Sequence, residues 1–147
     1  MAVRPRSTTP RLQAAGADRM PQLESFSLAG KQVSLVPLGP EHARELLAAS
    51  TADPSLYRWT VAPQSEPKMA EYIEAALAAQ RAGTAVPFAI VRAADGVVIG
   101  STRYFNLESW PWPAGHARFG RSLPDACEIG YTWYAATAIR TSANTEA

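Results

Sequence analysis

The dipeptide Asp95-Gly96 constrains the fold of this chain most strongly, because it lies between two runs with strand character. Val86 to Arg92 precedes the dipeptide, and Val97 to Phe105 follows it. A glycine after aspartate supplies the positive φ angles of a tight hairpin turn. The two runs are therefore predicted to pair as antiparallel strands. Gly100 lies inside the second run, where a glycine indicates a bulge or a close backbone approach.

Two further segments have the pattern of strands. Lys31 to Pro37 alternates polar and apolar residues, which is typical of a half-buried strand. Glu128 to Tyr134 is the other, and a long loop from Glu108 to Ala126 separates it from the hairpin. Strict alternation divides its side chains between two faces: Glu128, Gly130, Thr132 and Tyr134 on one, Ile129, Tyr131 and Trp133 on the other.

Two helices are predicted between the first strand and the hairpin. The first spans Pro40 to Ser50, with proline in its first turn. The second begins after the capping residue Ser65 and ends at Gly83. A loop with two prolines, Thr51 to Gln64, connects them. This order of elements predicts an α+β fold class, with a mixed, largely antiparallel sheet flanked by helices.

Composition limits the classes of protein that this chain can represent. Its 147 residues are the length of one domain, and 47% hydrophobic residues can fill a core. The formal net charge is only +1, without the basic excess typical of proteins that coat nucleic-acid phosphates. No apolar run approaches the roughly 18 residues of a membrane span. These features favour a soluble, cytoplasmic protein whose partners include no nucleic acid and no membrane.

The single cysteine, Cys127, cannot form an internal disulfide bond. No histidine lies at a spacing that indicates an activated thiol, so a small core residue is the favoured interpretation. The two histidines show no grouping with other ligand types, and we predict no metal.

The two ends of the chain differ from its middle. Residues 1–30 are rich in arginine and poor in large apolar residues, which predicts a mobile leader before a domain at residues 31–147. An organellar transit peptide is the alternative interpretation. At the other end, Asn144, Thr145 and Glu146 have the pattern of a helix start, yet the chain stops at Ala147. This predicts that the domain is truncated at the start of a helix.

Three segments in order carry a resemblance to a known family. Val98-Ile-Gly-Ser-Thr102 lies on the second hairpin strand, and Cys127 to Tyr134 contains E-I-G-Y. Ile139 to Ala147 ends in N-T-E-A. The chain from about Lys31 onward resembles the front part of a GNAT N-acetyltransferase, and in particular the branch that includes ribosomal-protein N-terminal acetyltransferases. The resemblance implies that the C-terminal strands and helices of that fold are missing.

The family resemblance implies an acetyl-CoA-dependent N-acetyltransferase that transfers acetyl to a primary amine, either a protein N-terminus or a small amine. The truncated chain is expected to be inactive alone. In the family the pantetheine arm of acetyl-CoA pairs with the end of the fourth strand, which by position implicates the backbone of Thr132, Trp133 and Tyr134. The pyrophosphate binds at the following helix start. The matching residues here are Arg140, Thr141, Ser142, Ala143, Asn144 and Thr145, although this segment lacks the glycines of the family pattern.

The family's chemistry is direct attack of the amine on the thioester, so the amine must lose a proton. Glu128 is predicted to be the general base, directly or through water. The alternative is that Glu128 is only a solvated or salt-bridged residue at a strand end. An oxyanion-type contact from the strand backbone would stabilise the developing charge.

The loop before the fourth strand contains two tryptophans spaced by prolines. Trp110 and Trp112 are rigid, amphipathic groups that could line a groove for the amine acceptor, together with Tyr104. The alternative is a hydrophobic cover packed over the hairpin.

A second class of function follows from what the chain lacks. In the family, a fifth strand opens the coenzyme cleft and a later helix supplies a general acid, and neither lies in these residues. The alternative function is a non-catalytic binding or interaction module derived from a GNAT half-domain, in which the exposed edge of the fourth strand meets a partner.

Overall fold

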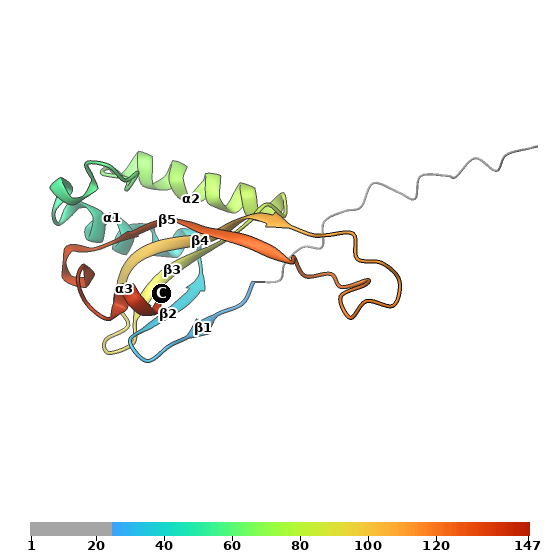
Figure 1. Ribbon diagram of the computed structural model, residues 1–147. Coiled ribbons are helices and arrows are strands. Elements are labelled where there is room, and N and C mark those ends of the chain that lie inside the picture. The colour runs from blue at the N-terminus through green and yellow to red at the C-terminus, as the bar shows by residue number, and fades with distance from the viewer. Residues whose placement is uncertain (1–24) are drawn as a thin grey trace, which may run out of the picture.

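The protein folds around one five-stranded sheet in a computed structural model that describes residues 25–147. The strands lie in the order in which they occur in the chain, and every pair is antiparallel (Figure 1). They are β1 (Leu28–Ala29), β2 (Val33–Pro37), β3 (Ala85–Arg92), β4 (Val98–Glu108) and β5 (Ala126–Tyr134). The predicted α+β class is confirmed, and the sheet is antiparallel throughout its described strands.

The helices match the predicted pattern with small differences at their ends. α1 (Ala43–Thr51) follows a 3₁₀ turn, η1 (Pro40–His42), and a second turn, η2 (Pro54–Tyr57), interrupts the predicted loop. α2 (Glu66–Arg81) ends just before Gly83, whose φ of 72° is the conformation that favours glycine. α1 and α2 lie on the same side of the sheet (Figure 1). After β5 come η3 (Ala136–Ala138) and the short α3 (Ala143–Glu146).

The sheet begins earlier in the chain than the sequence predicted. Leu28 and Ala29 pair with Leu35 and Ser34 as β1, inside the segment predicted to be a leader. A two-residue edge strand has too short a pattern to be recognised from alternation. The rest of the predicted leader, residues 1–24, lies outside the described residues.

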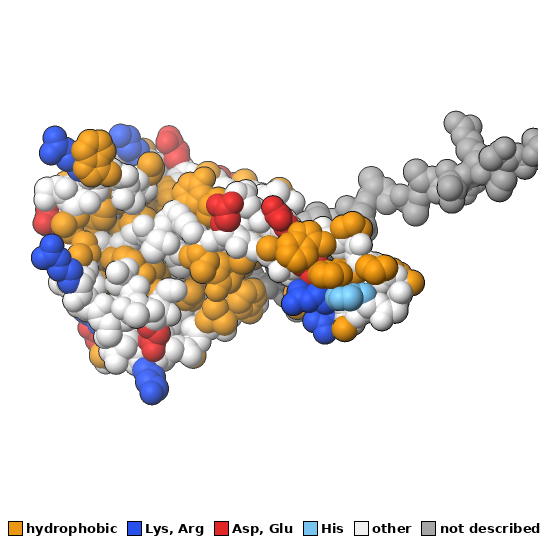
Figure 2. Space-filling view, viewed as in Figure 1, with side chains coloured by type: hydrophobic (Ala, Val, Ile, Leu, Met, Phe, Trp, Pro, Cys, Tyr) orange, Lys and Arg blue, Asp and Glu red, His pale blue; other side chains and the backbone are white. Residues whose placement is uncertain are grey.

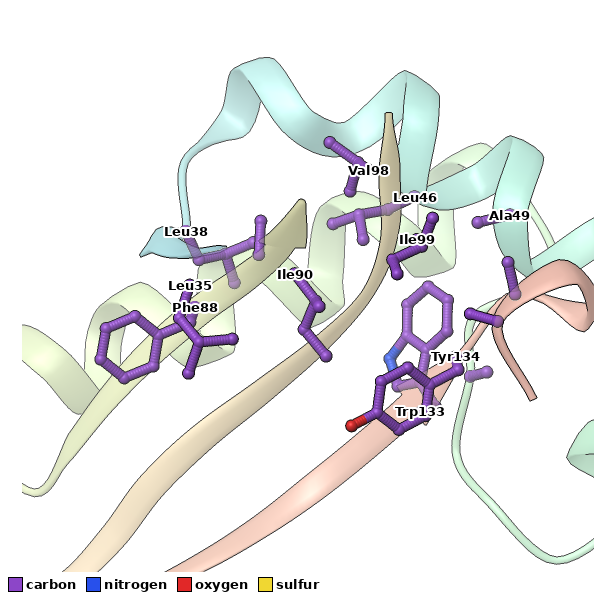
Figure 3. Close-up of a cluster of buried hydrophobic side chains, with 14 of the residues drawn as sticks. Leu35, Leu38, Leu46, Ala49, Phe88, Ile90, Val98, Ile99, Trp133 and Tyr134 are labelled. Carbon is purple, nitrogen blue, oxygen red and sulfur yellow. The ribbon is translucent and has the colours of Figure 1, made fainter. Parts of the chain in front are cut away.

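The core forms where α1 and α2 press against the sheet. α2 turns one apolar face to the sheet, with Met69, Ile73 and Ala76 buried. On α1, Leu46 is fully buried, and Figure 3 shows it with Ala49 close to the Trp133 ring. Each large side chain buried here contributes about 1.5–3 kcal/mol. The core therefore holds the end of β5 firmly against α1.

A bulge interrupts the pairing of β4 with β5. Ser101 pairs with Trp133, whereas Arg103 pairs with Gly130, so that two residues of β5 face Thr102. These two residues are Tyr131 and Thr132, and Tyr131 has a φ of 54°. The extra residue of a bulge is left out of the hydrogen-bonded ladder.

The bulge makes the predicted alternation of β5 wrong beyond Gly130. Tyr131 lies on the same face as Glu128 and Gly130, because its ring contacts Arg103 and Phe105. Thr132 lies on the opposite face, where its Oγ1 is 2.7 Å from Oγ1 of Thr102. One extra residue exchanges the two faces, since side chains alternate with a period of two. Trp133 consequently faces the helices and Tyr134 the other side.

Gly100 allows β4 and β5 to approach closely beside the bulge, as the sequence predicted. A Cβ atom at this position would lie 2.1 Å from the carbonyl oxygen of Trp133. That contact is with backbone, which cannot move aside without separating the strands.

We expect Gly100→Ala to lower the free energy of unfolding by about 1–3 kcal/mol, the usual cost of forcing extra volume into a packed site. Urea denaturation of both proteins would measure the difference. Gly39→Ala is the matched control, because the atoms nearest to its Cβ would belong to the flexible Glu41 side chain. Equal stability of the Gly100 and Gly39 variants would contradict the backbone clash.

Candidate active site

The segment that follows β5 lines a cavity at one end of the sheet, where β2 and β4 begin and β3 ends. The cavity has a volume of about 300 Å³, and its walls include Thr141, Ser142 and Ala143. Lys31 and Arg92 contribute from the β1–β2 turn and the end of β3. Three of the six residues predicted to bind the coenzyme pyrophosphate therefore share a cavity with two basic residues. Arg140, Asn144 and Thr145 are exposed.

No sequence pattern indicated that Lys31 and Arg92 belong to this site, because both lie far from N-T-E-A in the chain. Lys31 is 115 residues from Glu146, and only the antiparallel sheet brings the two ends together. The guanidinium of Arg92 is also paired with Asp95 across 2.9 Å. Cations beside hydroxyl groups and backbone N–H groups can together bind anions such as phosphate.

The Glu146 carboxylate fastens the last turn of the chain to the β1–β2 turn. Its oxygens accept hydrogen bonds from the backbone N–H groups of Lys31 at 2.8 Å, Val33 at 2.9 Å and Gln32. Gly30 makes room for this carboxylate, because a Cβ atom there would lie 2.6 Å from its Cδ. The glutamate of N-T-E-A thus acts as a clamp that holds the cavity wall in place.

The same contacts perturb the acidity of Glu146. The N–H groups of Gln32, Val33 and Lys31 lower its pKa below the ordinary glutamate value. A lowered pKa means that the clamp is complete above the unfolded-state pKa and is lost only as the pH falls through the folded-state value.

We expect the amide proton shifts of Lys31, Gln32 and Val33 to titrate together, with a midpoint below that of an ordinary glutamate. NMR spectra recorded across the acidic range would measure it. Glu146→Gln should abolish the transition and speed hydrogen exchange at the three amides. Glu45→Gln is the control, because Glu45 accepts a hydrogen bond from the Val98 amide instead. A transition that survives Glu146→Gln would show that another group causes it.

The end of β5 lies at an edge of the described sheet, directly before the cavity segment. Trp133 and Tyr134 are buried, whereas Thr132 is half-buried. Tyr57 donates a hydrogen bond from its hydroxyl to the Tyr134 carbonyl at 2.7 Å, and burial raises the pKa of that hydroxyl. An edge strand keeps one row of backbone groups available to a further extended chain.

Glu128 lies near the start of β5, on the face that carries Tyr131. Its side chain is exposed, and Oε1 accepts a hydrogen bond from Asn106 Nδ2 at 2.9 Å. It forms no ion pair within the described residues, so the salt-bridged alternative has no support there. Cys127 beside it is exposed, contrary to the predicted core position.

The loop between β4 and β5 is organised around Asp125. This carboxylate accepts hydrogen bonds from Trp110 N at 2.8 Å, Trp112 Nε1 at 2.9 Å and Arg118 Nη1 at 2.9 Å. The Trp112 ring also stacks on His116, with centroids 4.0 Å apart. The contacts that fix the two tryptophans thus come from within the loop. Figure 2 shows hydrophobic, basic and histidine side chains gathered on the surface of this loop.

Tyr104 lies in a different place from the tryptophans. It contacts Phe88 edge to face and lines an apolar pocket of about 270 Å³ with Leu107 and Leu123. Asp125 lies on the rim of this pocket, and neither tryptophan lines it. Trp110 is half exposed, at 50% of its surface. The structure therefore brings the three predicted acceptor residues to one region through Asp125, without placing them in one groove.

We expect Asp125→Ala to release the two tryptophans without unfolding the core. The N–H of Trp110, the indole of Trp112 and Arg118 hold the pKa of Asp125 below its ordinary value. The loop should therefore loosen in the natural chain only as the pH falls through that lowered pKa. Tryptophan fluorescence and its quenching by acrylamide would report the change. Asp95→Ala removes a comparable Arg-paired aspartate in the other hairpin and should leave the quenching unchanged.

Neither a metal centre nor a membrane span is found in the described part of the chain. No group of three or more His, Cys, Asp and Glu residues in it could hold an ion. No helix among residues 25–147 is long and apolar enough to cross a bilayer.

Comparison with known families identifies the class of protein. The family model described as "Acetyltransferase (GNAT) domain" matches residues 32–147, which include the whole sheet except β1. The chain therefore belongs to the GNAT acetyltransferase family. No curated protein matches the chain.

Solved structures of GNAT proteins share the fold. A GCN5-related N-acetyltransferase from Brucella melitensis has a TM-score of 0.64 at 22% identity over 85% of this chain. RimL, a ribosomal L7/L12 alpha-N-protein acetyltransferase, has a TM-score of 0.60 at 12% sequence identity over 95% of this chain. The Microcin C7 self-immunity acetyltransferase MccE, in complex with acetyl-CoA and AMP, has a TM-score of 0.58 at 14% sequence identity over 79% of this chain. At these identities the likeness establishes the fold alone.

This chain is shorter than the solved relatives. It spans 52% of the Brucella protein, 58% of MccE and 64% of RimL.

Proposed function

We propose that this protein takes part in acetyl-CoA-dependent transfer of an acetyl group to a primary amine. The observation that carries the proposal is the family match over residues 32–147, joined to a bulged edge strand that leads into a cavity with two basic residues. The activity is proposed for the whole protein, because the chain spans 52–64% of the structures compared above.

The coenzyme would be held by two parts of the chain. The backbone of Thr132, Trp133 and Tyr134 lies on an edge strand, whose outer row of backbone groups suits the amides of the pantetheine arm. The Tyr134 carbonyl would share its hydrogen bond from Tyr57 with the arm. The phosphates would lie near the cavity segment that contains Thr141 and Ser142, with Lys31 supplying a positive charge. When bound, acetyl-CoA supplies a thioester that an amine can attack.

The reaction also requires a group that takes a proton from the amine and a group that stabilises the developing negative charge. Residues of β5 are proposed to supply both. Glu128 is exposed and can accept a proton from the acceptor ammonium, directly or through water. The bulge at Tyr131 leaves a backbone group outside the ladder, where an N–H could donate to a developing negative charge. These roles of Glu128 and of the bulge are proposals.

The acceptor is proposed to be a protein N-terminus or a small amine. The RimL likeness and the E-I-G-Y and N-T-E-A segments favour a protein N-terminus. Trp110, the exposed tryptophan of the loop between β4 and β5, could contact such an acceptor.

Calorimetry with acetyl-CoA tests the proposal. The intact mass of the endogenous protein should be measured first, because it decides which chain is titrated. We expect binding that weakens when Ser142→Glu places a negative charge in the cavity wall. Glu128→Gln should leave binding unchanged and lower kcat about 10²-fold or more, the usual contribution of a general base.

Absence of heat at millimolar acetyl-CoA would count against the proposal. In that case the exposed Ile129 and Tyr131, at 63% and 55% of their surfaces, would favour the alternative, an interaction module that uses this strand. Size-exclusion chromatography would then reveal a stable assembly.

A further inference from the structure

Arg103 is a buried arginine with no counter-charge among residues 25–147. It lies in β4 on the face that α2 covers, and only 8% of its surface is exposed. No carboxylate of the described residues lies within 4.0 Å of its guanidinium. Its Nε is buried and has no hydrogen-bond acceptor there. Burying a charge is costly unless the charge is paired and hydrogen-bonded, so this arrangement requires an explanation.

Two tyrosine rings hold the guanidinium. Its central carbon lies 4.2 Å from the ring centroid of Tyr131 and 5.2 Å from that of Tyr72. Tyr72 is fixed by a hydrogen bond from its hydroxyl to Ser101 Oγ at 3.1 Å, and Tyr131 by the bulge. Cation–π contacts offset part of the cost of burial. An aromatic ring offers no carbonyl or carboxylate oxygen, so neither contact supplies the acceptor that Nε lacks.

The N–H groups of a guanidinium fit a carboxylate. Its N–H groups form a rigid fork that matches the two carboxylate oxygens, and such paired bonds are among the strongest in proteins. An anion bound there would neutralise the charge and supply the acceptor that Nε lacks.

The position of Arg103 connects this anion to the proposed reaction. Tyr131 is the bulge residue of β5, where the acetyl group is proposed to be transferred. Tyr72 also lines a cavity of about 480 Å³, whose polar lining residues are Gln64, Lys68 and Glu71. Arg103 thus contacts one tyrosine of the proposed reaction site and one tyrosine of a cavity large enough for a small molecule or a chain end.

We propose that Arg103 binds a carboxylate of the amine acceptor, so that the preferred acceptors are amino acids or peptides with an acid group near the reacting amine. This inference rests on the proposed acetyl transfer and specifies the acceptor for it.

A series of acceptors tests the inference on the endogenous protein. Glycine, β-alanine and 4-aminobutyrate are compared with their carboxamides as acetyl acceptors. We expect at least one acid to exceed its amide in kcat/KM by about tenfold or more, the scale of a lost charged hydrogen bond. The difference should lie mainly in KM. 2-Aminoethyl phosphate is included, and a preference for it over every carboxylate would overturn the choice of carboxylate.

Variants assign the preference to Arg103. Arg103→Gln should reduce the preference for acids to near unity while acetylation of the amides persists. Arg103→Lys keeps a charge without the fork, so it should lose most of the preference and is less prone to misfold. Arg81→Gln is the matched control, since Arg81 is an exposed arginine paired with Glu74. A preference that survives in both Arg103 variants would overturn the inference.

A readout without activity separates the two proposals. The Nε–H resonance of Arg103 should shift when 4-aminobutyrate is titrated into the unchanged protein and remain in place with the amide. If no amine is acetylated, the proposed function fails and this inference fails with it. If acids and amides are acetylated equally and the resonance does not move, this inference alone fails.

Discussion

The close pairing of β4 with β5 is the constraint on which the rest of the structure depends. Gly100 lets the Trp133 carbonyl approach the backbone of β4, and the bulge opposite Thr102 follows within the same few residues. The pairing seats Trp133 against α1 and turns Tyr131 toward Arg103. The core, the proposed transfer site and the buried arginine are thus consequences of a single register between two strands.

A second constraint joins the two ends of the described chain. The Glu146 carboxylate accepts hydrogen bonds from three backbone N–H groups of the β1–β2 turn, and Gly30 leaves space for it. The cavity wall around Ser142 is held to the sheet by this contact. A carboxylate that caps backbone donors is more strongly fixed than an exposed ion pair, because several directed hydrogen bonds must break together. These hydrogen bonds therefore tie the segment proposed to bind phosphates to the β1–β2 turn.

Local patterns predicted most elements because their signals lie within a few residues. Asp95-Gly96 specified the hairpin, Ser65 and Gly83 marked the ends of α2, and Gly100 indicated the close approach. The faces of β5 could not be predicted beyond Gly130. Alternation assumes one residue for each partner, and nothing in β5 alone marks the extra residue. Because the extra residue could not be recognised from the sequence, the contact between Tyr131 and Arg103 could not be predicted either.

The sequence by itself determined the order of elements, the antiparallel hairpin and the family resemblance, since each depends on residues adjacent in the chain. Only the tertiary structure decided which distant groups meet. Lys31 lies beside Ser142, Glu146 reaches the β1–β2 turn, and Arg103 lies between Tyr72 and Tyr131. The roles predicted for Glu128 and the residues that follow it stay predictions. These distant contacts could not be predicted from the sequence, because they depend on strand register and side-chain packing. Register and packing join residues that share no pattern in the chain.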